Sequence, residues 1–216
     1  MKIPNPKAQS PSPKALLSLL AVLVAAPVHA QEIGVRGFAD IGSRTFTATE
    51  SFTAVLGTDS GGVFGGGVEA TLPLGLFVNV RASRFRAEGE RVFIFNDERF
   101  DLGIPTVITV TPLELTGGYR LPFWTRIVPY AGVGVGWHTY TEISEFATDS
   151  ENVEMRRTGL HLLGEYGVAR WIAAAGELQW ANVPDALGED PNGVAAHFDE
   201  DNLGGVTFRV KIVVGR

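Results

Sequence analysis

The stretch Val206-Thr-Phe-Arg-Val-Lys-Ile-Val-Val214 sorts its side chains onto two faces. One face carries Val206, Phe208, Val210, Ile212 and Val214, and the other carries Arg209 and Lys211. Alternation with a period of two, in β-branched and aromatic residues, is typical of a β-strand, because a helical period of 3.6 would mix the two sets. The stretch therefore predicts a strand with an apolar face and a charged face.

The same alternation recurs along the chain. It predicts strands near 34–46, 62–72, 76–86, 107–120, 127–140, 158–169, 173–183 and 203–215. Each is about ten residues long, which suits a tilted strand that crosses a membrane. The connections near 73–75, 121–126 and 170–171 are short, whereas 47–61, 87–106, 141–157 and 184–202 are long. Short periplasmic turns that alternate with long extracellular loops are typical of outer-membrane barrels.

The charged residues decide which face of each strand points inward. Nine of them share the polar faces: Arg36, Asp40, Glu69, Arg81, Glu114, Glu165, Glu177, Arg209 and Lys211. A barrel in lipid keeps charges inside and apolar residues outside, whereas a soluble ligand-carrying barrel does the reverse. We therefore predict an all-β, eight-stranded antiparallel up-and-down transmembrane β-barrel. The soluble alternative would expose Arg209 and Lys211.

Aromatic residues gather at the two ends of the predicted strands. Tyr119, Trp124 and Trp171 lie near the short turns, and Phe64, Trp137 and Trp180 lie near the long loops. Aromatic rings of this kind occupy the two membrane–water interfaces of such barrels. The six residues are thus predicted to form two interfacial girdles.

The first thirty residues have the pattern of a cleavable signal peptide. Lys2, Lys7 and Lys14 precede the apolar run 15–26, and Ala30 ends a suitable cleavage site. About twelve apolar residues are too few for a membrane-spanning helix, which needs roughly twenty. We expect residues 1–30 to be the signal peptide and residues 31–216 to be the barrel domain.

Composition excludes several classes of protein. The chain has no cysteine, which rules out disulfides and thiolate metal sites. The net charge is −6 and no basic stripe is present, so nucleic acid is not an expected partner. Glycine-rich runs such as 65–67 and 132–136 fall inside predicted strands, where glycine relieves crowding.

The strand segments resemble a known family. The likeness rests on Gly34–Gly42, Pro112–Leu121, Pro129–Trp137 and Gly205–Ile212. They resemble the small outer-membrane β-barrel proteins of the opacity and OmpA-transmembrane type. This resemblance implies a porin-like barrel in the cell envelope of a Gram-negative bacterium, located in the cell outer membrane. Implied partners are outer-membrane lipid, lipopolysaccharide and the barrel-assembly machinery. One departure is the end Val213-Val-Gly-Arg216, which lacks the usual terminal aromatic residue.

The inward charges predict a network that fills the lumen, because about eight strands enclose only a narrow interior. We expect Arg81 to lie between Glu69 and Glu114, and barrel closure to bring Arg36 and Asp40 toward Arg209 and Lys211. The alternative is that these groups line a narrow aqueous or proton path.

Candidate catalytic residues are few. His138 and His161, with Glu165, could suggest a metal or acid–base site, but their spacing is not diagnostic. No serine lies in a cluster that would give a lipid-modifying enzyme its nucleophile and base. We therefore predict no enzymatic activity, catalytic residue, cofactor or metal.

The remaining prediction concerns function. The long loops 141–157 and 184–202 are acidic. We expect a monomeric barrel with a structural or surface-interaction role, in envelope integrity, adhesion or ligand contact through these loops. A narrow channel for small or apolar solutes is the alternative, and a lipid-modifying enzyme is a third hypothesis.

Overall fold

The computed structural model describes residues 33–95, 98–120, 127–145, 153–168, 172–188 and 193–215. The expected signal peptide, Trp124 and Trp171 lie outside these ranges. The strands are β1 (Gly34–Phe46), β2 (Ser60–Thr71), β3 (Leu76–Phe95), β4 (Glu98–Arg120), β5 (Ile127–Ser144), β6 (Val153–Val168), β7 (Ile172–Asn182) and β8 (Gly205–Gly215). The helices are α2 (Thr49–Leu56), the 3₁₀ turn η1 (Pro73–Gly75) and α3 (Val194–His197). No helix in these ranges is long and apolar enough to cross a membrane.

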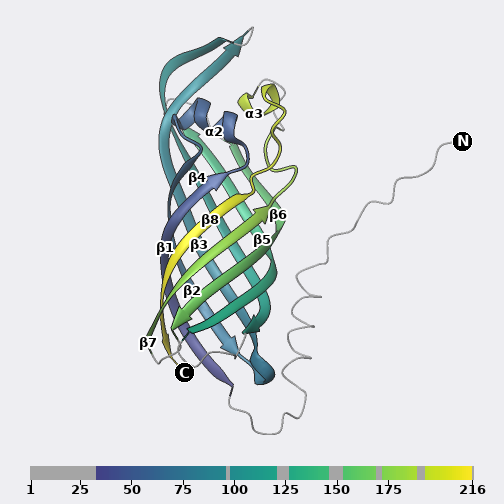
Figure 1. Ribbon diagram of the computed structural model, residues 1–216. Helices are drawn as coiled ribbons and strands as arrows, with labels where there is room; N and C mark the ends of the chain where they lie inside the picture. The colour runs from purple at the N-terminus through teal and green to yellow at the C-terminus, as the bar shows by residue number, and fades with distance from the viewer. Residues whose placement is uncertain are drawn as a thin grey trace, which may run out of the picture. The chain divides into compact units, whose positions relative to one another are not determined.

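The strands form a closed antiparallel ring. Each strand pairs with its neighbours in sequence, and β1 also pairs with β8, which closes the barrel (Figure 1). Closure leaves no unpaired sheet edge within the ring, as a β structure in lipid requires. The predicted fold, an eight-stranded up-and-down barrel, is confirmed.

The exterior of the ring is apolar where β8 crosses it. The side chains of Val206, Phe208, Val210, Ile212 and Val214 are between 44% and 59% exposed. Arg209 and Lys211, on the opposite face, are 1% and 0% exposed. A soluble barrel would reverse this arrangement, so the alternative fold is excluded by the orientation of β8.

The apolar exterior ends at a common level on neighbouring strands. Leu113 on β4 lies opposite Trp137 on β5, and both side chains point outward. Toward the long-loop end, the next outward residues on β4, β5 and β6 are Thr111, Thr139 and Thr158. On β3 the outward residues past this level are Arg84 and Arg86. We call the zone below this level the apolar belt, because its outward side chains match the lipid interior, whereas those immediately above it are polar or charged.

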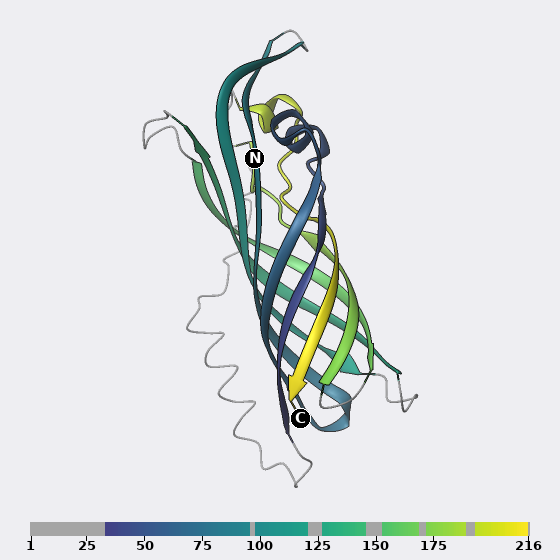
Figure 2. The ribbon, with the colours of Figure 1, turned by 90° about the vertical axis from the view of Figure 1, so that its left-hand side faces the viewer.

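Two strands continue well past the belt. β3 and β4 form one long hairpin that extends to Phe95 and Glu98 and projects beyond the other strands (Figure 2). The expectation that 87–106 is a loop was wrong. Alternation persists there, but the outward positions carry charges such as Glu88 and Glu90, so an apolar-outward pattern does not reveal the strand.

Above the belt the interior becomes apolar. Phe46 stacks on Phe52 of α2 with ring centroids 4.0 Å apart, and Phe85 contacts Phe46 edge-on at 4.9 Å. The segment 183–203 adds Val183, Leu187 and Leu203, which are also buried. The predicted loops 47–61 and 184–202 therefore contain the short helices α2 and α3 and help to form an upper core. In this region the barrel has an apolar interior, and its exterior carries charged side chains together with exposed apolar ones such as Phe93 and Ile143.

The helix α2 ends for a local reason. Gly57 adopts a left-handed conformation with φ of 74°, and its N–H donates to the carbonyl of Thr53 at 2.9 Å. This is a common glycine helix end, since other residues are strained at positive φ. After this turn the chain enters β2. The helix α2 lies at the mouth of the barrel (Figure 1).

Candidate functional site

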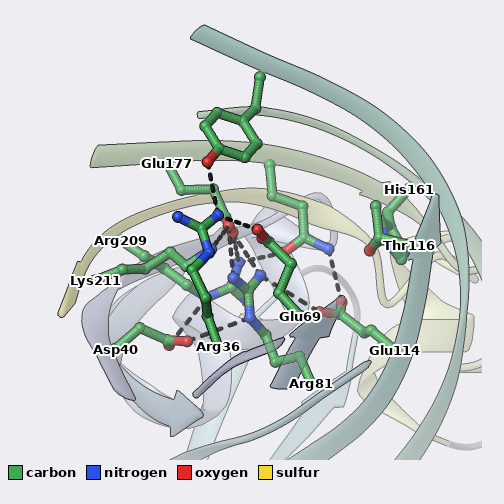
Figure 3. Close-up of polar contacts among 12 residues, drawn as sticks. Arg36, Asp40, Glu69, Arg81, Glu114, Thr116, His161, Glu177, Arg209 and Lys211 are labelled. Carbon is green, nitrogen blue, oxygen red and sulfur yellow. Dashed lines mark hydrogen bonds and ion pairs between the residues drawn. The ribbon is translucent and has the colours of Figure 1, made fainter. Parts of the chain in front are cut away.

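A charged cluster at the centre of the lumen is the candidate site (Figure 3). Arg81 from β3 donates two hydrogen bonds of 2.5 Å, from Nη1 and Nη2, to the two carboxylate oxygens of Glu177 on β7. Glu177 also accepts from Arg209 Nη1 at 3.0 Å and lies 3.4 Å from Lys211 Nζ. One carboxylate thus contacts three cations. The paired forks of Arg81 and Glu177 are the strongest ion-pair geometry available to these side chains.

Asp40 from β1 supplies a second anion to the same cations. Its oxygens lie 3.2 Å from Arg81 Nε and 3.6 Å from Arg209 Nε, distances of ion pairs without hydrogen-bond geometry. Asp40 lies directly opposite Lys211 in the β1–β8 register. Barrel closure therefore brings Asp40 to Arg209 and Lys211.

Glu114 from β4 joins the cluster through an amide. Gln179 Nε2 on β7 donates to Glu114 Oε1 at 2.7 Å, and Gln179 Oε1 accepts from Arg209. Arg81 Nη1 lies 3.9 Å from Glu114. We refer to Asp40, Arg81, Glu114, Glu177, Gln179, Arg209 and Lys211 together as the lumen network. Its side chains come from β1, β3, β4, β7 and β8, so it ties together strands from around the barrel.

Glu69 and Arg36 form a separate pair toward the short-turn end. Arg36 is paired with Glu69 and also donates to the Tyr130 hydroxyl at 2.7 Å. The register explains this pairing, because Arg36 is directly opposite Glu69 on the adjacent strand. Glu69 faces Asn79 on β3, two residues before Arg81. The expectation that Arg81 lies between Glu69 and Glu114 was therefore wrong for Glu69, because Arg81 contacts Glu177, Asp40 and Glu114. The expectation that Arg36 lies toward Arg209 and Lys211 was also wrong, because Arg36 pairs with Glu69.

The structure describes the side chains of eight of the nine predicted lumen charges, and all eight are buried. The side chain of Glu165 lies outside the described part. Arg44 is a buried cation that our sequence prediction missed. Its guanidinium donates to the Leu203 carbonyl at 2.8 Å and stacks over Phe46 at 4.8 Å. Arg44 follows Arg36 and Asp40 at intervals of four residues, and this even spacing indicates that it shares their inward face.

Apolar side chains close the lumen on the short-turn side of the network. Phe38 lies under both Arg81 and Lys211, with cation-to-ring distances of 5.2 and 4.4 Å. Phe77 packs edge-on against Tyr130, with ring centroids 5.5 Å apart. The upper core covers the network on the other side. The lumen network therefore lies between aromatic side chains on one side and the upper core on the other, and surroundings of low polarity strengthen the attraction between its charges.

The two lumen histidines are buried, at 2% exposed for His138 and 1% for His161. His161 Nε2 shares a hydrogen bond of 2.7 Å with the Thr116 hydroxyl (Figure 3). A Cβ at Gly134 would lie 2.5 Å from His161 Nε2, so glycine at this position provides the space for the ring. Within the described ranges, no group of three or more His, Asp or Glu side chains could hold a metal ion.

Four of the six predicted girdle residues can be placed. Phe64, Trp137 and Trp180 point outward near the upper edge of the apolar belt, with exposed fractions of 60%, 38% and 49%. Tyr119 is 40% exposed and lies opposite Leu76, which is the residue that follows the short turn η1. Trp124 and Trp171 lie outside the described residues. The three upper residues occupy the level where the exterior changes from apolar to polar.

Comparison with known proteins identifies the fold. No protein-family model matches the chain, and no curated protein sequence matches it either. Among solved structures it is similar to Neisserial surface protein A, with 9% identity and a TM-score of 0.51 over 87% of this chain and 99% of that one. The chain has the fold of a small outer-membrane β-barrel. The outer-membrane location expected from the sequence agrees with this fold and with the apolar belt.

Two other solved structures are similar at lower scores. The N-terminal β-barrel domain of Pseudomonas aeruginosa OprF has 11% identity and a TM-score of 0.47, covering 85% of this chain and 99% of that one. A major outer membrane protein from Thermus thermophilus has 13% identity and a TM-score of 0.47, covering 87% of this chain and 100% of that one.

Proposed function

We propose that the protein is a closed outer-membrane barrel with a structural and surface-interaction role. The observation that carries this proposal is the bidentate pair of Arg81 and Glu177. These residues come from β3 and β7, which are not neighbours in the ring, so their side chains meet across the lumen. The pair, with Arg209 and Lys211 beside it, occupies the interior where a solute would have to pass.

The pairing also argues against a narrow ion or proton path. A conducting lumen needs sites that bind an ion weakly enough to release it. Here Glu177 contacts three cations and Asp40 two, so the carboxylates already have partners. The apolar layers above and below would further oppose entry of an ion.

The extracellular end supports a surface role. The β3–β4 hairpin, α2 and α3 project above the apolar belt (Figure 2), and the hairpin exposes both charged and aromatic side chains, among them Phe93 and Phe100. Exposed ion pairs lie on the hairpin, for example Arg99 with Asp101, whose Nη2 and Oδ1 atoms are 2.6 Å apart. The similar Neisserial protein is, by its name, a surface protein. We propose a monomer held in outer-membrane lipid and lipopolysaccharide by its apolar belt, presenting these segments to a ligand.

The proposal includes no catalytic role. A lipid hydrolase of the serine type needs a histidine base within hydrogen-bond reach of a nucleophile that its substrate can approach. His138 and His161 are instead buried inside the barrel.

Electrical recording tests the closed lumen. Purified barrel in a planar bilayer is expected to show no stable unitary conductance in concentrated salt, because the lumen network fills the interior. A variant with both Arg81→Ala and Glu177→Ala removes the crossing pair and should admit small ions. The matched control is Arg86→Ala with Glu88→Ala, an exposed pair 3.5 Å apart that should leave the barrel closed. Porin-like conductance of the unaltered protein would contradict the proposal.

A further inference from the structure

The extracellular end contains a cavity of about 700 Å³. It lies above the apolar belt, among β3, β4, β5 and β6 on one side and α2 and the α3 segment on the other. Its volume falls within the range of about 300–1,000 Å³ that small-molecule sites occupy. The cavity is distinct from the lumen network, which lies below it within the belt.

The wall of the cavity is mainly apolar. Phe52 and Val55 come from α2, Ile108 from β4, Met155 from β6 and Leu187 from the segment that follows β7. Four of these, all except Met155, belong to the buried upper core, so the core forms the wall of the site and holds it in place. Apolar lining of this kind favours a ligand that releases water from its own apolar surface.

The floor separates the cavity from the membrane region. Phe52 lines the cavity and stacks on Phe46, which in turn contacts Phe85 and the Arg44 guanidinium. Arg44 is 3% exposed and bonded to the Leu203 carbonyl. A molecule that enters from outside therefore stops at this layer. The cavity is therefore closed on the side that faces the lumen.

Hydrogen-bonding groups are concentrated on β5. Tyr140 donates its hydroxyl proton to Glu142 Oε2 at 2.9 Å, and Ser144 shares a 2.9 Å hydrogen bond with Thr106. Tyr140, Glu142 and Ser144 all line the cavity. The second oxygen of the partly exposed Glu142 carboxylate can accept a hydrogen bond from a ligand.

The charges that line the cavity have both signs. Arg91 contributes a cation, whereas Glu142 and Glu154 contribute anions. An anionic head group would meet two carboxylates and a single guanidinium, and it would also lose hydration on entry. The lining thus fits a head group that donates a hydrogen bond better than an anionic one.

We propose that this cavity binds a small molecule with an apolar body and a single hydrogen-bond-donating group, such as an aliphatic alcohol. The proposal deepens the surface role proposed above by naming the ligand class, and it rests on the extracellular placement of this end. The apolar body packs against Phe52, Val55 and Met155, and the donor group meets Glu142.

Met155 provides a local reporter. The chain has two methionines, Met1 and Met155, so methyl-¹³C-methionine labelling gives at most two resonances, and Met155→Leu identifies the relevant one. With the barrel in lipid nanodiscs, added 1-octanol is expected to shift the Met155 methyl resonance saturably. Octanoate should bind about tenfold more weakly, since its carboxylate donates no hydrogen bond and brings a negative charge beside Glu142 and Glu154.

A matched pair of variants tests the position. Ala195 lines the cavity, whereas its neighbour Ala196 on α3 does not. Ala195→Trp should fill the space and weaken octanol binding at least about tenfold, and Ala196→Trp should leave it unchanged. A gel mobility that changes on boiling shows that a variant forms the folded barrel. If Ala195→Trp does not fold, Ala195→Phe fills less of the cavity and replaces it in the test.

Two results would overturn the inference. A Met155 shift that grows linearly with octanol and is equal in both tryptophan variants would mean simple partitioning into the bilayer. Octanoate binding as tightly as octanol would contradict a head group that donates a hydrogen bond to Glu142. Bilayer conductance is measured on the lumen, so its outcome decides the closed-barrel function separately from the result for this cavity.

Discussion

Replacing Glu177 with glutamine is expected to lower the free energy of unfolding by about 3–5 kcal/mol, as expected when one partner of a buried charge cluster is removed. Glutamine keeps the size of the side chain but loses the charge. Arg81, Arg209 and Lys211 would then share the single carboxylate of Asp40 and the more distant Glu114. Uncompensated positive charge at the centre of the barrel is the physical reason for the loss.

Urea unfolding of the barrel in phospholipid vesicles measures this change. Glu88→Gln is the matched control, because Glu88 is an exposed partner of Arg86 and its side chain is 78% exposed. An exposed pair of this kind contributes about 0–1 kcal/mol. A Glu177→Gln variant as stable as Glu88→Gln would mean that the lumen network contributes little to the fold.

Replacing Val210 with arginine is the second large change. Val210 lies at the middle of the outward face of β8 and is 48% exposed. An outward arginine near the middle of a membrane costs about 2–4 kcal/mol, because lipid does not solvate the charge. The same vesicle unfolding experiment should show a loss of this size.

Thr158→Arg is the control, because it places the same outward charge at the edge of the apolar belt instead of its middle. Thr158 also points outward but lies opposite Trp137, at the upper edge of the belt. A charge near the interface costs about 0–1 kcal/mol. Equal stability of the Val210→Arg and Thr158→Arg variants would show that the face of β8 does not lie in lipid.

Side-chain alternation predicts the barrel because the strand period and the two environments reinforce each other. On β8, every second residue from Val206 to Val214 is apolar and outward, and Arg209 and Lys211 are inward, as expected. The same logic fails at 87–106, since β3 and β4 rise above the belt and their outward residues there are charged. A pattern defined by apolar exteriors detects only the part of a strand that lies in lipid.

Which charged side chains pair within the lumen is harder to predict than which face of a strand they occupy. Sequence places Glu69 and Arg81 on inward faces, but only the register shows that Glu69 faces Arg36 and that Arg81 reaches Glu177 across the ring. A two-residue difference in register changes which charges meet. Arg44 could have been found from its spacing to Arg36 and Asp40.

The extracellular cavity has no counterpart in local sequence patterns. Its walls come from strands, α2 and the segment after β7, which lie far apart in the chain, as Phe52 and Leu187 illustrate. Loops that cover a barrel mouth are positioned by tertiary packing, in this case by the stacked rings of Phe46 and Phe52. Periodicity carries no information on such contacts.

Cell fractionation followed by electrophoresis of unheated and boiled samples tests whether the chain forms a closed barrel in the outer membrane. A closed barrel with an apolar exterior resists detergent until it is heated, because its strands are paired all around the ring. We expect a protein in the outer-membrane fraction whose gel mobility changes on boiling. A soluble periplasmic protein with the same mobility before and after boiling would contradict it.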